Sequence, residues 1–182
     1  YRNADPSDIV VTAAGGLVGE VAQVWRPKQI NTFETDWGYS CMGYEISGAL
    51  GIKMAKPKQE VIVFVGDGSY LLNNSDIYSS ILYEKKLIIV VCDNSGHMVI
   101  NRLQLAKGGK EYLCNLKTSR ATNFIEVDFA AHAASMGAET ETVTSTSELE
   151  SAFLRAKKSN KTYVIALKTH GYEWLEGTSF WE

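Results

Sequence analysis

Four short runs of apolar residues alternate with amphipathic stretches along the chain. They cover Ile9–Thr12, Val61–Val65, Leu87–Cys92 and Tyr163–Leu167. The second and third runs are almost continuously apolar, as strands are when helices cover both faces of a parallel sheet. We therefore predict four buried β-strands at these positions.

Residues with helical periodicity lie between the apolar runs. The stretch Ser69–Glu84 is predicted to form one helix, because it places Leu72, Ile77, Ile81 and Leu82 near one face. A second helix is expected to be capped by Asp128 and stopped by Gly137. A third is expected to begin at the capping-box pair Ser147 and Glu150.

The alternation of strand and helix predicts one α/β domain over residues 1–182. Its sheet is expected to be doubly wound and mainly parallel, with helices on both faces. The stretch Ser95–Thr122 has weak periodicity and is predicted to be a long functional loop with some helix. A content of 45% hydrophobic and 21% charged residues is typical of a globular protein.

Composition narrows the range of partners and compartments. The net charge of −3 argues against a nucleic-acid surface. No apolar run approaches the roughly 20 residues of a membrane helix, and the polar first residues do not resemble a signal peptide. Three cysteines, Cys41, Cys92 and Cys114, form no C-x-x-C pair, and Cys92 is expected to be a small buried hydrophobe. We expect a cytoplasmic protein with a small-molecule substrate and neither nucleic-acid nor membrane partners.

Two strand ends carry the most informative residues. The strand Val61–Val65 runs into Gly66–Ser69, and the next strand ends at Asp93–Gly96. If both strands belong to one parallel sheet, a right-handed crossover joins them. Asp67 and Asn94 would then emerge side by side at the carboxyl edge, where ligands bind in open α/β folds.

The residue types at this edge suit a phosphate group held through a metal ion. Gly66 and Gly68 let the backbone turn sharply and approach a ligand closely. The helix after Ser69 directs its N-terminal amides at the edge. Asp67 offers an anionic oxygen and Asn94 a neutral one, and magnesium prefers about six oxygens shared with phosphates. The alternative is a pair of plain turns, because Asp-Gly and Asn-Ser-Gly are common loop sequences.

The spacing of these residues resembles the motif of thiamine diphosphate enzymes, which begins with Gly-Asp-Gly and closes with Asn-Asn. Here Gly66–Gly68 is followed after 25 residues by Asn94, with Asp93 in the place of the first Asn. The resemblance implies that Asp67 and Asn94 are ligands of Mg²⁺. It also implies that the carbonyl of Gly96 is the third protein ligand.

A second stretch, Trp37–Tyr44, is similar to the Gly-x-Met-Gly segment of acetolactate-synthase-like enzymes. The resemblance implies that Met42 wedges between the two rings of the cofactor and enforces its bent form. It further implies that the carbonyl of Ser40, where the family usually has Gly, accepts a hydrogen bond from the 4′-amino group. Gly68 and Ser69 would contact the diphosphate. Without the resemblance, Met42 fits a helix core as well.

The finer resemblance is to one branch of this family, the trihydroxycyclohexanedione hydrolases of inositol catabolism. It is carried by Phe33–Glu45, Cys92–His97 and His170–Trp174. It extends over nearly the whole chain but only over the C-terminal domain of those enzymes, so we expect a fragment. The implied reaction is hydrolytic C–C cleavage of a cyclic 1,2-dione to 5-deoxyglucuronate. The implied partner is the pyrimidine-binding domain, which carries the glutamate that protonates N1′, and a homo-oligomer is expected because such sites lie between subunits.

Residues that handle substrate protons are harder to assign. His97 is the candidate, because it follows the metal loop and histidine titrates near neutral pH. A loop histidine without chemistry is the alternative, and His132 is expected to be structural. The remaining candidates near the substrate, or for a lid or subunit contact, are Asp36, Trp37, His170, Tyr172, Trp174, Phe180 and Trp181.

Two other functions remain open on the sequence. Acetolactate-type decarboxylation and carboligation would use the same cofactor residues. A non-catalytic α/β module that binds phosphate would need neither Met42 nor magnesium.

Overall fold

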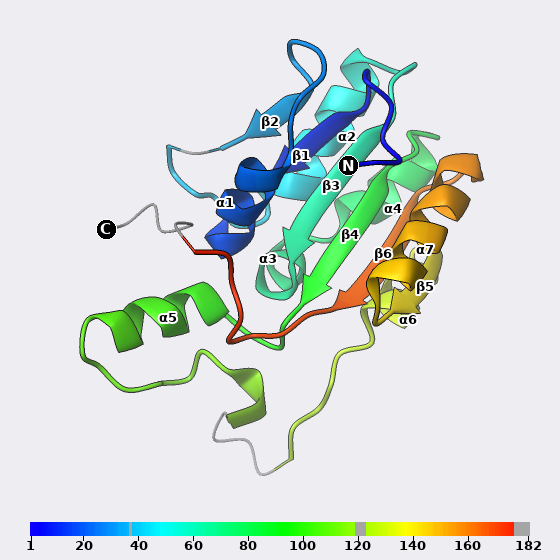
Figure 1. Cartoon of the computed structure of the whole chain (residues 1–182). Coiled ribbons are helices and arrows are strands. Elements are labelled where there is room, and N and C mark those ends of the chain that lie inside the picture. Colours follow the sequence, from blue (N-terminus) through cyan, green and yellow to red (C-terminus); the bar gives the residue numbers. More distant parts are fainter. Residues whose placement is uncertain (37, 119–122, 177–182) are drawn as a thin grey trace.

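The computed structural model describes residues 1–36, 38–118 and 123–176, and Trp37, Phe180, Trp181 and the end of the predicted loop at 119–122 lie outside them. Six parallel strands form one sheet in the order β2-β1-β3-β4-β6-β5 (Figure 1). The strands are β1 (Ile9–Thr12), β2 (Phe33–Thr35), β3 (Val61–Gly66), β4 (Ile88–Asp93), β5 (Glu139–Val143) and β6 (Tyr163–Lys168). The predicted doubly wound parallel sheet is confirmed.

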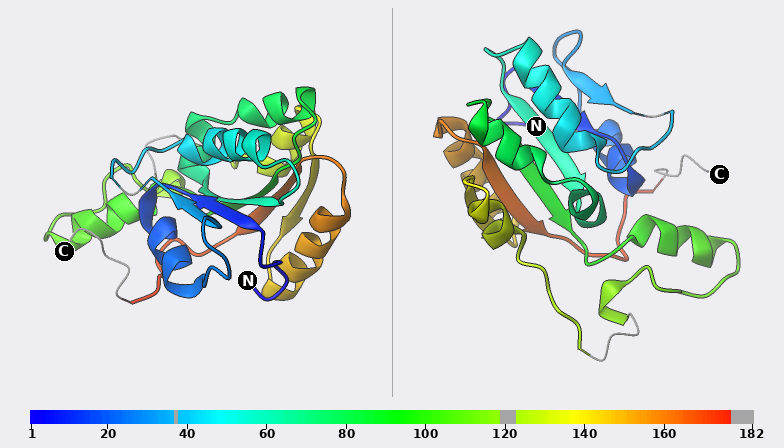
Figure 2. Two further views of the ribbon diagram at one scale, coloured as in Figure 1. Left: turned by 90° about the horizontal axis from the view of Figure 1, so that it is seen from above. Right: turned by 180° about the vertical axis from the view of Figure 1, so that it is seen from behind.

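Helices cover both faces of the sheet, as Figure 2 shows from above. One face packs against α2 (Tyr44–Ala55), α3 (Asp67–Leu72), α4 (Asp76–Leu82) and α6 (Phe129–Ser135). The other face packs against α1 (Gly15–Val24) and α7 (Thr146–Lys158). The helix α5 (Met98–Ala106) and the 3₁₀ turn η1 (Leu116–Thr118) lie beyond the end of β4.

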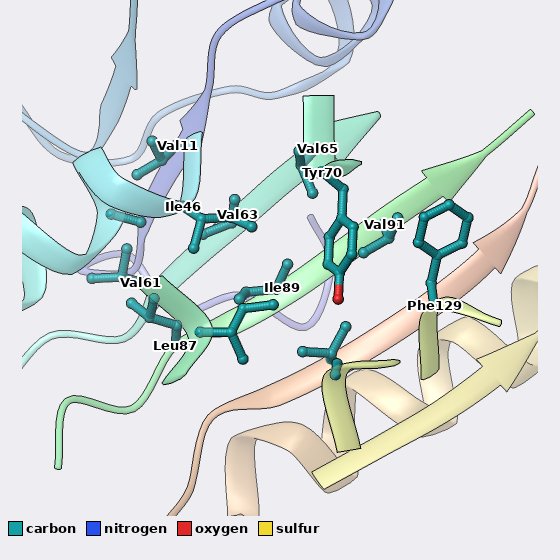
Figure 3. Packing of buried hydrophobic residues seen from close by; sticks show 14 of the residues in the cluster. Val11, Ile46, Val61, Val63, Val65, Tyr70, Leu87, Ile89, Val91 and Phe129 are labelled. Carbon is teal, nitrogen blue, oxygen red and sulfur yellow. The ribbon is translucent and has the colours of Figure 1, made fainter. Parts of the chain in front are cut away.

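The core explains why the apolar runs become strands. Val63, Val65, Ile89 and Val91 point from β3 and β4 into the layer that contains Tyr70 (Figure 3). Alternate residues of the same strands, such as Ile62 and Ile88, enter the second layer. Because both faces of each central strand are buried, both strands read as continuous apolar runs.

The predicted helix Ser69–Glu84 is wrong in its continuity, since two helices occupy this stretch. The chain leaves α3 at Asn73, whose backbone is extended. The side-chain amide of Asn73 donates to the Gly43 carbonyl at 3.1 Å and to Ser47 Oγ at 2.8 Å. Asparagine side chains often compete with helical hydrogen bonds in this way. The break therefore fastens the end of α3 to the turn before α2.

The helix starts differ in how well the sequence located them. Asp128 caps α6 by accepting a hydrogen bond from the Ala131 amide at 2.9 Å, as predicted. The predicted start of α7 at Ser147 is wrong, because its capping box is Ser145 with Glu148, two residues earlier. Both pairs have the same spacing, and the earlier one gives α7 an additional half turn.

Both edge strands lie outside the apolar runs from which strands were predicted. β2 is only three residues long, and none of its residues is fully buried. β5 has the sequence Glu-Thr-Glu-Thr-Val, and only Val143 is buried. Short or charged strands are common at sheet edges, where they lack the apolar pattern of central strands.

The three cysteines are free, as expected from their spacing. Cys114 is buried and Cys41 is exposed. Cys92 is half-buried rather than fully enclosed, because the end of β4 borders an open cavity beside α1 and α5.

Candidate cofactor-binding site

The carboxyl ends of β3 and β4 lie side by side, with Gly66 opposite Cys92 in the register. The turns that follow the two strands are joined by Asp67. Its Oδ1 accepts a hydrogen bond from the Gly68 amide at 2.7 Å, and its Oδ2 accepts one from the Gly96 amide at 2.9 Å. The carboxylate of Asp67 therefore links the Gly-Asp-Gly turn to the turn that contains Asn94.

Asn94 carries an unsatisfied polar atom at this junction. Its Oδ1 is buried and has no hydrogen-bond partner in the described part of the chain. A buried acceptor without a partner is costly and calls for an explanation. A cation held jointly with the neighbouring carboxylate would satisfy this oxygen.

The turn after β4 is held rigidly by the segment before η1. The His97 amide donates to the Cys114 carbonyl at 2.8 Å, and the Leu116 amide donates to the Ser95 carbonyl at 2.9 Å. Gly96 fits closely here, because a β-carbon at this position would lie 2.1 Å from the Cys114 carbonyl oxygen. Only glycine can occupy this position without moving the backbone.

One cavity of about 390 Å³ collects the residues that the sequence singled out. All eight predicted cofactor residues and His97 line its wall: Ser40, Met42, Gly66, Asp67, Gly68, Ser69, Asn94, Gly96 and His97. They come from three separated segments, before α2, after β3 and after β4.

A fourth segment of this wall carries no residue that was predicted from the sequence. Residues 14–17, at the start of α1, also line the cavity. Their signal in the sequence was the pair Gly15-Gly16 directly after an apolar run. Gly15 has a left-handed backbone with φ of 77°. Helix N-termini offer free amides to anions, so α1 adds to the phosphate-binding character of the cavity.

Met42 lies outside the helix core. It precedes α2, its side chain is 41% exposed, and its methyl group approaches Gly68. Ser40 and Gly43 on either side have left-handed backbones, with φ of 50° and 93°. The turn thus presents Met42 to the cavity, across from the Gly-Asp-Gly turn.

The three histidines occupy different surroundings. His97 is exposed at the start of α5, and its ring lies against Gly68, where a β-carbon would overlap it. His132 pairs its Nδ1 with the Tyr70 hydroxyl at 2.9 Å and packs edge-to-face on that ring, which gives it a structural place. His170 is exposed, and its Nδ1 accepts a hydrogen bond from the Tyr172 amide at 3.3 Å.

The aromatic tail follows β6 and passes beside α5. The Tyr172 hydroxyl donates to Glu111 at 2.7 Å and accepts from the Asn115 amide at 2.8 Å. The Trp174 ring stacks on the guanidinium of Arg102 at 4.7 Å. Asp36, another candidate near the substrate, accepts a hydrogen bond from the Cys41 amide and so braces the turn before Met42.

Burial makes Asp67 costly to ionise. Burial raises the pKa of Asp67 to about 6, and the nearby Asp93 carboxylate contributes in the same direction. The amides of Gly96 and Gly68 act against this shift. Asp93 forms an ion pair with Lys168 at 2.6 Å, whereas Asp67 forms no ion pair with any residue that the structure describes. A bound divalent cation would stabilise the ionised form of Asp67.

This pKa shift leads to a prediction for the pH dependence of stability. The folded chain holds a proton on Asp67 more tightly than the unfolded chain, so Asp67 stabilises the fold below about pH 4. That contribution is lost as the pH rises through about 6. The measured quantity is the free energy of unfolding of Asp67→Asn minus that of the wild type, in metal-free buffer. This difference should become more favourable to the variant by roughly 1–3 kcal/mol from about pH 4 to pH 7. Urea denaturation at several pH values measures this difference, and a difference that stays constant from about pH 4 to pH 7 would refute the prediction.

The donor set is one that magnesium accepts. Among the described residues, no three side chains of His, Cys, Asp or Glu gather around a common point. The site instead offers one carboxylate and one amide oxygen, and Gly96 belongs to the same turn as Asn94. Magnesium favours such oxygen ligands and takes most of the rest from phosphate and water. The residues present therefore fit a Mg²⁺–diphosphate group.

Comparison with known proteins identifies the family. Residues 13–167 match the model of the thiamine pyrophosphate enzyme C-terminal TPP binding domain. The chain is 39% identical to a 3D-(3,5/4)-trihydroxycyclohexane-1,2-dione hydrolase of Halalkalibacterium halodurans, over 96% of this chain and 29% of that protein. It is 41% identical to the protein of the same name from Listeria monocytogenes, over 98% of this chain and 28% of that protein. The chain thus spans under a third of the length of these relatives.

Solved structures agree on the fold. Benzoylformate decarboxylase from Polynucleobacter necessarius matches 95% of this chain, with a TM-score of 0.77 and 21% identity, over 32% of its own length. A thiamine diphosphate-dependent 4-hydroxybenzoylformate decarboxylase from Rhodococcus jostii matches 93%, with a TM-score of 0.75 and 16% identity, over 31% of its length.

The described helices include none that is both long and apolar enough to cross a bilayer. The fold, the paired strand ends and the family match agree with one another. The chain belongs to the thiamine pyrophosphate enzymes and corresponds to their C-terminal cofactor-binding domain.

Proposed function

We propose that this chain holds the diphosphate of thiamine diphosphate through a Mg²⁺ ion bound by Asp67, Asn94 and the Gly96 carbonyl. The observation that carries the proposal is the buried, unpartnered Oδ1 of Asn94. It belongs to the turn to which the Asp67 carboxylate is hydrogen-bonded. A divalent cation would satisfy the amide oxygen and would offset the cost of ionising Asp67.

The wall of the cavity supports distinct roles for its residues. The start of α1 would direct backbone amides at the diphosphate, and Gly68, whose own amide donates to Asp67, would let the backbone approach it closely. The Ser69 hydroxyl already donates to Glu45 at 2.9 Å, so the Ser69 backbone amide is the group left for a phosphate oxygen. Met42 would hold the bent form of the cofactor, and the Ser40 carbonyl would orient its amino group.

We further propose hydrolytic C–C cleavage of a cyclic 1,2-dione as the reaction of the protein in which this domain acts. The names of relatives at 39–41% identity support this substrate. When bound, the cofactor supplies a nucleophilic carbon that can add to a ketone, and the protein contributes binding and orientation. His97 borders the cavity and is the proposed proton carrier. Addition of water and cleavage of one ring bond would give the open-chain 5-deoxyglucuronate.

The reaction is expected to need a pyrimidine-binding domain and a second subunit. The purified chain should bind thiamine diphosphate only with Mg²⁺ and should not turn over the dione. Turnover should appear when the N-terminal domains of the Halalkalibacterium relative are fused to it, with 5-deoxyglucuronate detected by NMR. Dione hydrolysis by the chain alone would refute the division of labour.

The same fusion separates the alternative functions. Acetolactate formed from pyruvate, without dione hydrolysis, would favour a decarboxylase–carboligase. Weak phosphate binding that ignores Mg²⁺ would favour a non-catalytic module.

A further inference from the structure

Glu45 is a buried carboxylate beside the cofactor cavity that forms no ion pair among the described residues. It lies in the first turn of α2 and is 1% exposed. Its Oε1 accepts hydrogen bonds from the Ser69 hydroxyl at 2.9 Å and the Ala14 amide at 3.3 Å, and its Oε2 accepts one from the Gly43 amide at 2.9 Å. Burial of an anion at this place therefore depends on neutral donors alone.

The three donors come from three different segments of the cavity wall. Ala14 precedes α1, Gly43 follows Met42, and Ser69 belongs to the Gly-Asp-Gly turn and α3. A further bond joins two of them directly, since the Gly43 amide also lies 3.0 Å from Ser69 Oγ. One side chain thus connects the turn that carries Met42 with the segment that faces the diphosphate.

Besides Glu45, polar contacts rather than apolar packing hold the turn that carries Met42. One of them is the hydrogen bond from the Cys41 amide to Asp36. Tyr39 is 87% exposed and Met42 is 41% exposed, so apolar packing contributes little. Ser40 and Gly43 have left-handed backbones, which other residues seldom adopt without support. On the far side of the turn, the Gly43 carbonyl is held by Asn73. Glu45 and Asn73 together hold both polar groups of Gly43.

A carboxylate is the side chain that this arrangement requires. Both of its oxygens accept hydrogen bonds, and each has a backbone amide as a donor. In a glutamine, one oxygen becomes an NH₂ group that would face either the Gly43 amide or the Ala14 amide. Two donors cannot satisfy each other, so one bond is lost in either orientation.

We propose that Glu45 is a positioning residue that sets Met42 against Gly68 and thereby shapes the cavity for the thiamine rings. This inference rests on the proposed function and adds a residue that acts through the turn without touching the cofactor. It assigns Glu45 to recognition of the ring portion, whereas Asp67 and Asn94 serve the diphosphate.

The first test is hydrogen exchange in Glu45→Gln without cofactor. Either the Gly43 amide or the Ala14 amide, depending on which way the glutamine side chain turns, should exchange about tenfold faster, because the loss of one hydrogen bond to a charged acceptor corresponds to at least that factor. The Val90 amide in β4 should keep its rate relative to global unfolding. Unchanged protection at both amides would overturn the proposal.

The second test compares two probes, thiamine diphosphate and inorganic pyrophosphate, each with Mg²⁺. Glu45→Gln should weaken thiamine diphosphate binding about tenfold and pyrophosphate binding much less. Equal losses for both probes, or no loss, would overturn the proposal. If the wild type binds neither probe, the proposed function itself fails, which is a separate result from wild-type binding with an unchanged variant.

A matched control separates positioning from stability. Asp8 is also a buried carboxylate, 4% exposed, but it lies at the opposite edge of the sheet, before β1, where it accepts from Lys157 at 2.9 Å. Asp8→Asn should lower stability without changing the ratio of the two affinities. If Glu45→Gln does not fold, Glu45→Asp is the second variant. It keeps the charge but withdraws both oxygens by one methylene. It should change the amide exchange and the ratio of the two affinities in the same direction as Glu45→Gln. A folded Glu45→Asp with wild-type values for both would overturn the proposal.

Discussion

Asp67→Ala is expected to abolish the Mg²⁺-dependent binding of thiamine diphosphate while the fold survives. Asp67 offers the carboxylate at the junction of the two strand-end turns, and its loss would leave the proposed Mg²⁺ site with neutral protein ligands only. We expect at least about a 100-fold loss of affinity, as for removal of a buried charged partner. Calorimetric titration with thiamine diphosphate, with and without Mg²⁺, measures the effect.

The same substitution should cost little stability. Burial disfavours the ionised Asp67, so its removal eliminates a penalty and offsets the two hydrogen bonds that are lost. Asp128→Ala serves as the control, because it removes the cap of α6 at a cost of about 1 kcal/mol and should leave the affinity unchanged. Wild-type affinity in Asp67→Ala, still dependent on Mg²⁺, would contradict the assignment of the metal site.

Gly96→Ala is expected to damage both binding and stability. The added β-carbon would lie 2.1 Å from the Cys114 carbonyl oxygen, which is backbone and cannot rotate away. That oxygen also accepts the His97 amide, so the turn and the segment before η1 must separate together. We expect the free energy of unfolding to fall by about 1–3 kcal/mol, as in overpacked sites. Affinity for thiamine diphosphate should fall about 100-fold, because the proposed carbonyl ligand moves with the turn.

Gly51→Ala is the matched control for this change. Gly51 lies within α2, and a β-carbon there would meet nothing within 4 Å. Alanine favours the helix by up to about 1 kcal/mol over glycine, so this variant should be neutral or stabilised and should bind normally. Denaturant unfolding and calorimetry on the pair separate the specific clash from a general effect of alanine. Equal behaviour of the two variants would show that the turn adapts.

The central part of the fold could be predicted because its physical signal is local. The strands β3 and β4 are buried on both faces, so they are visible in the sequence as continuous apolar runs. The edge strand β5 carries charged residues, and its pairing with β6 depends on contacts that no local pattern contains. The break at Asn73 was missed for a similar reason, because its side chain bonds to the distant Gly43.

The site likewise contains residues that a local sequence pattern predicted and residues that it did not. Asp67 and Asn94 were found because each follows a recognisable strand, and parallel strand ends meet at one edge. Glu45 was not found, because no helix was predicted over Tyr44–Ala55 and a single glutamate carries no local sign of burial. Its burial arises only when Ala14, Gly43 and Ser69 converge from positions far apart in the sequence.

The enclosed carboxylate of Asp67 has a consequence for laboratory evolution of this domain. A library screened only for heat resistance, at neutral pH and with chelator present, would reward replacement of this side chain by a neutral one. The surviving variants would be more stable but would lack the proposed Mg²⁺ ligand. Screens for stable variants should therefore include Mg²⁺ and thiamine diphosphate at saturating concentration. Ligand binding would then stabilise the folded state of variants that keep Asp67.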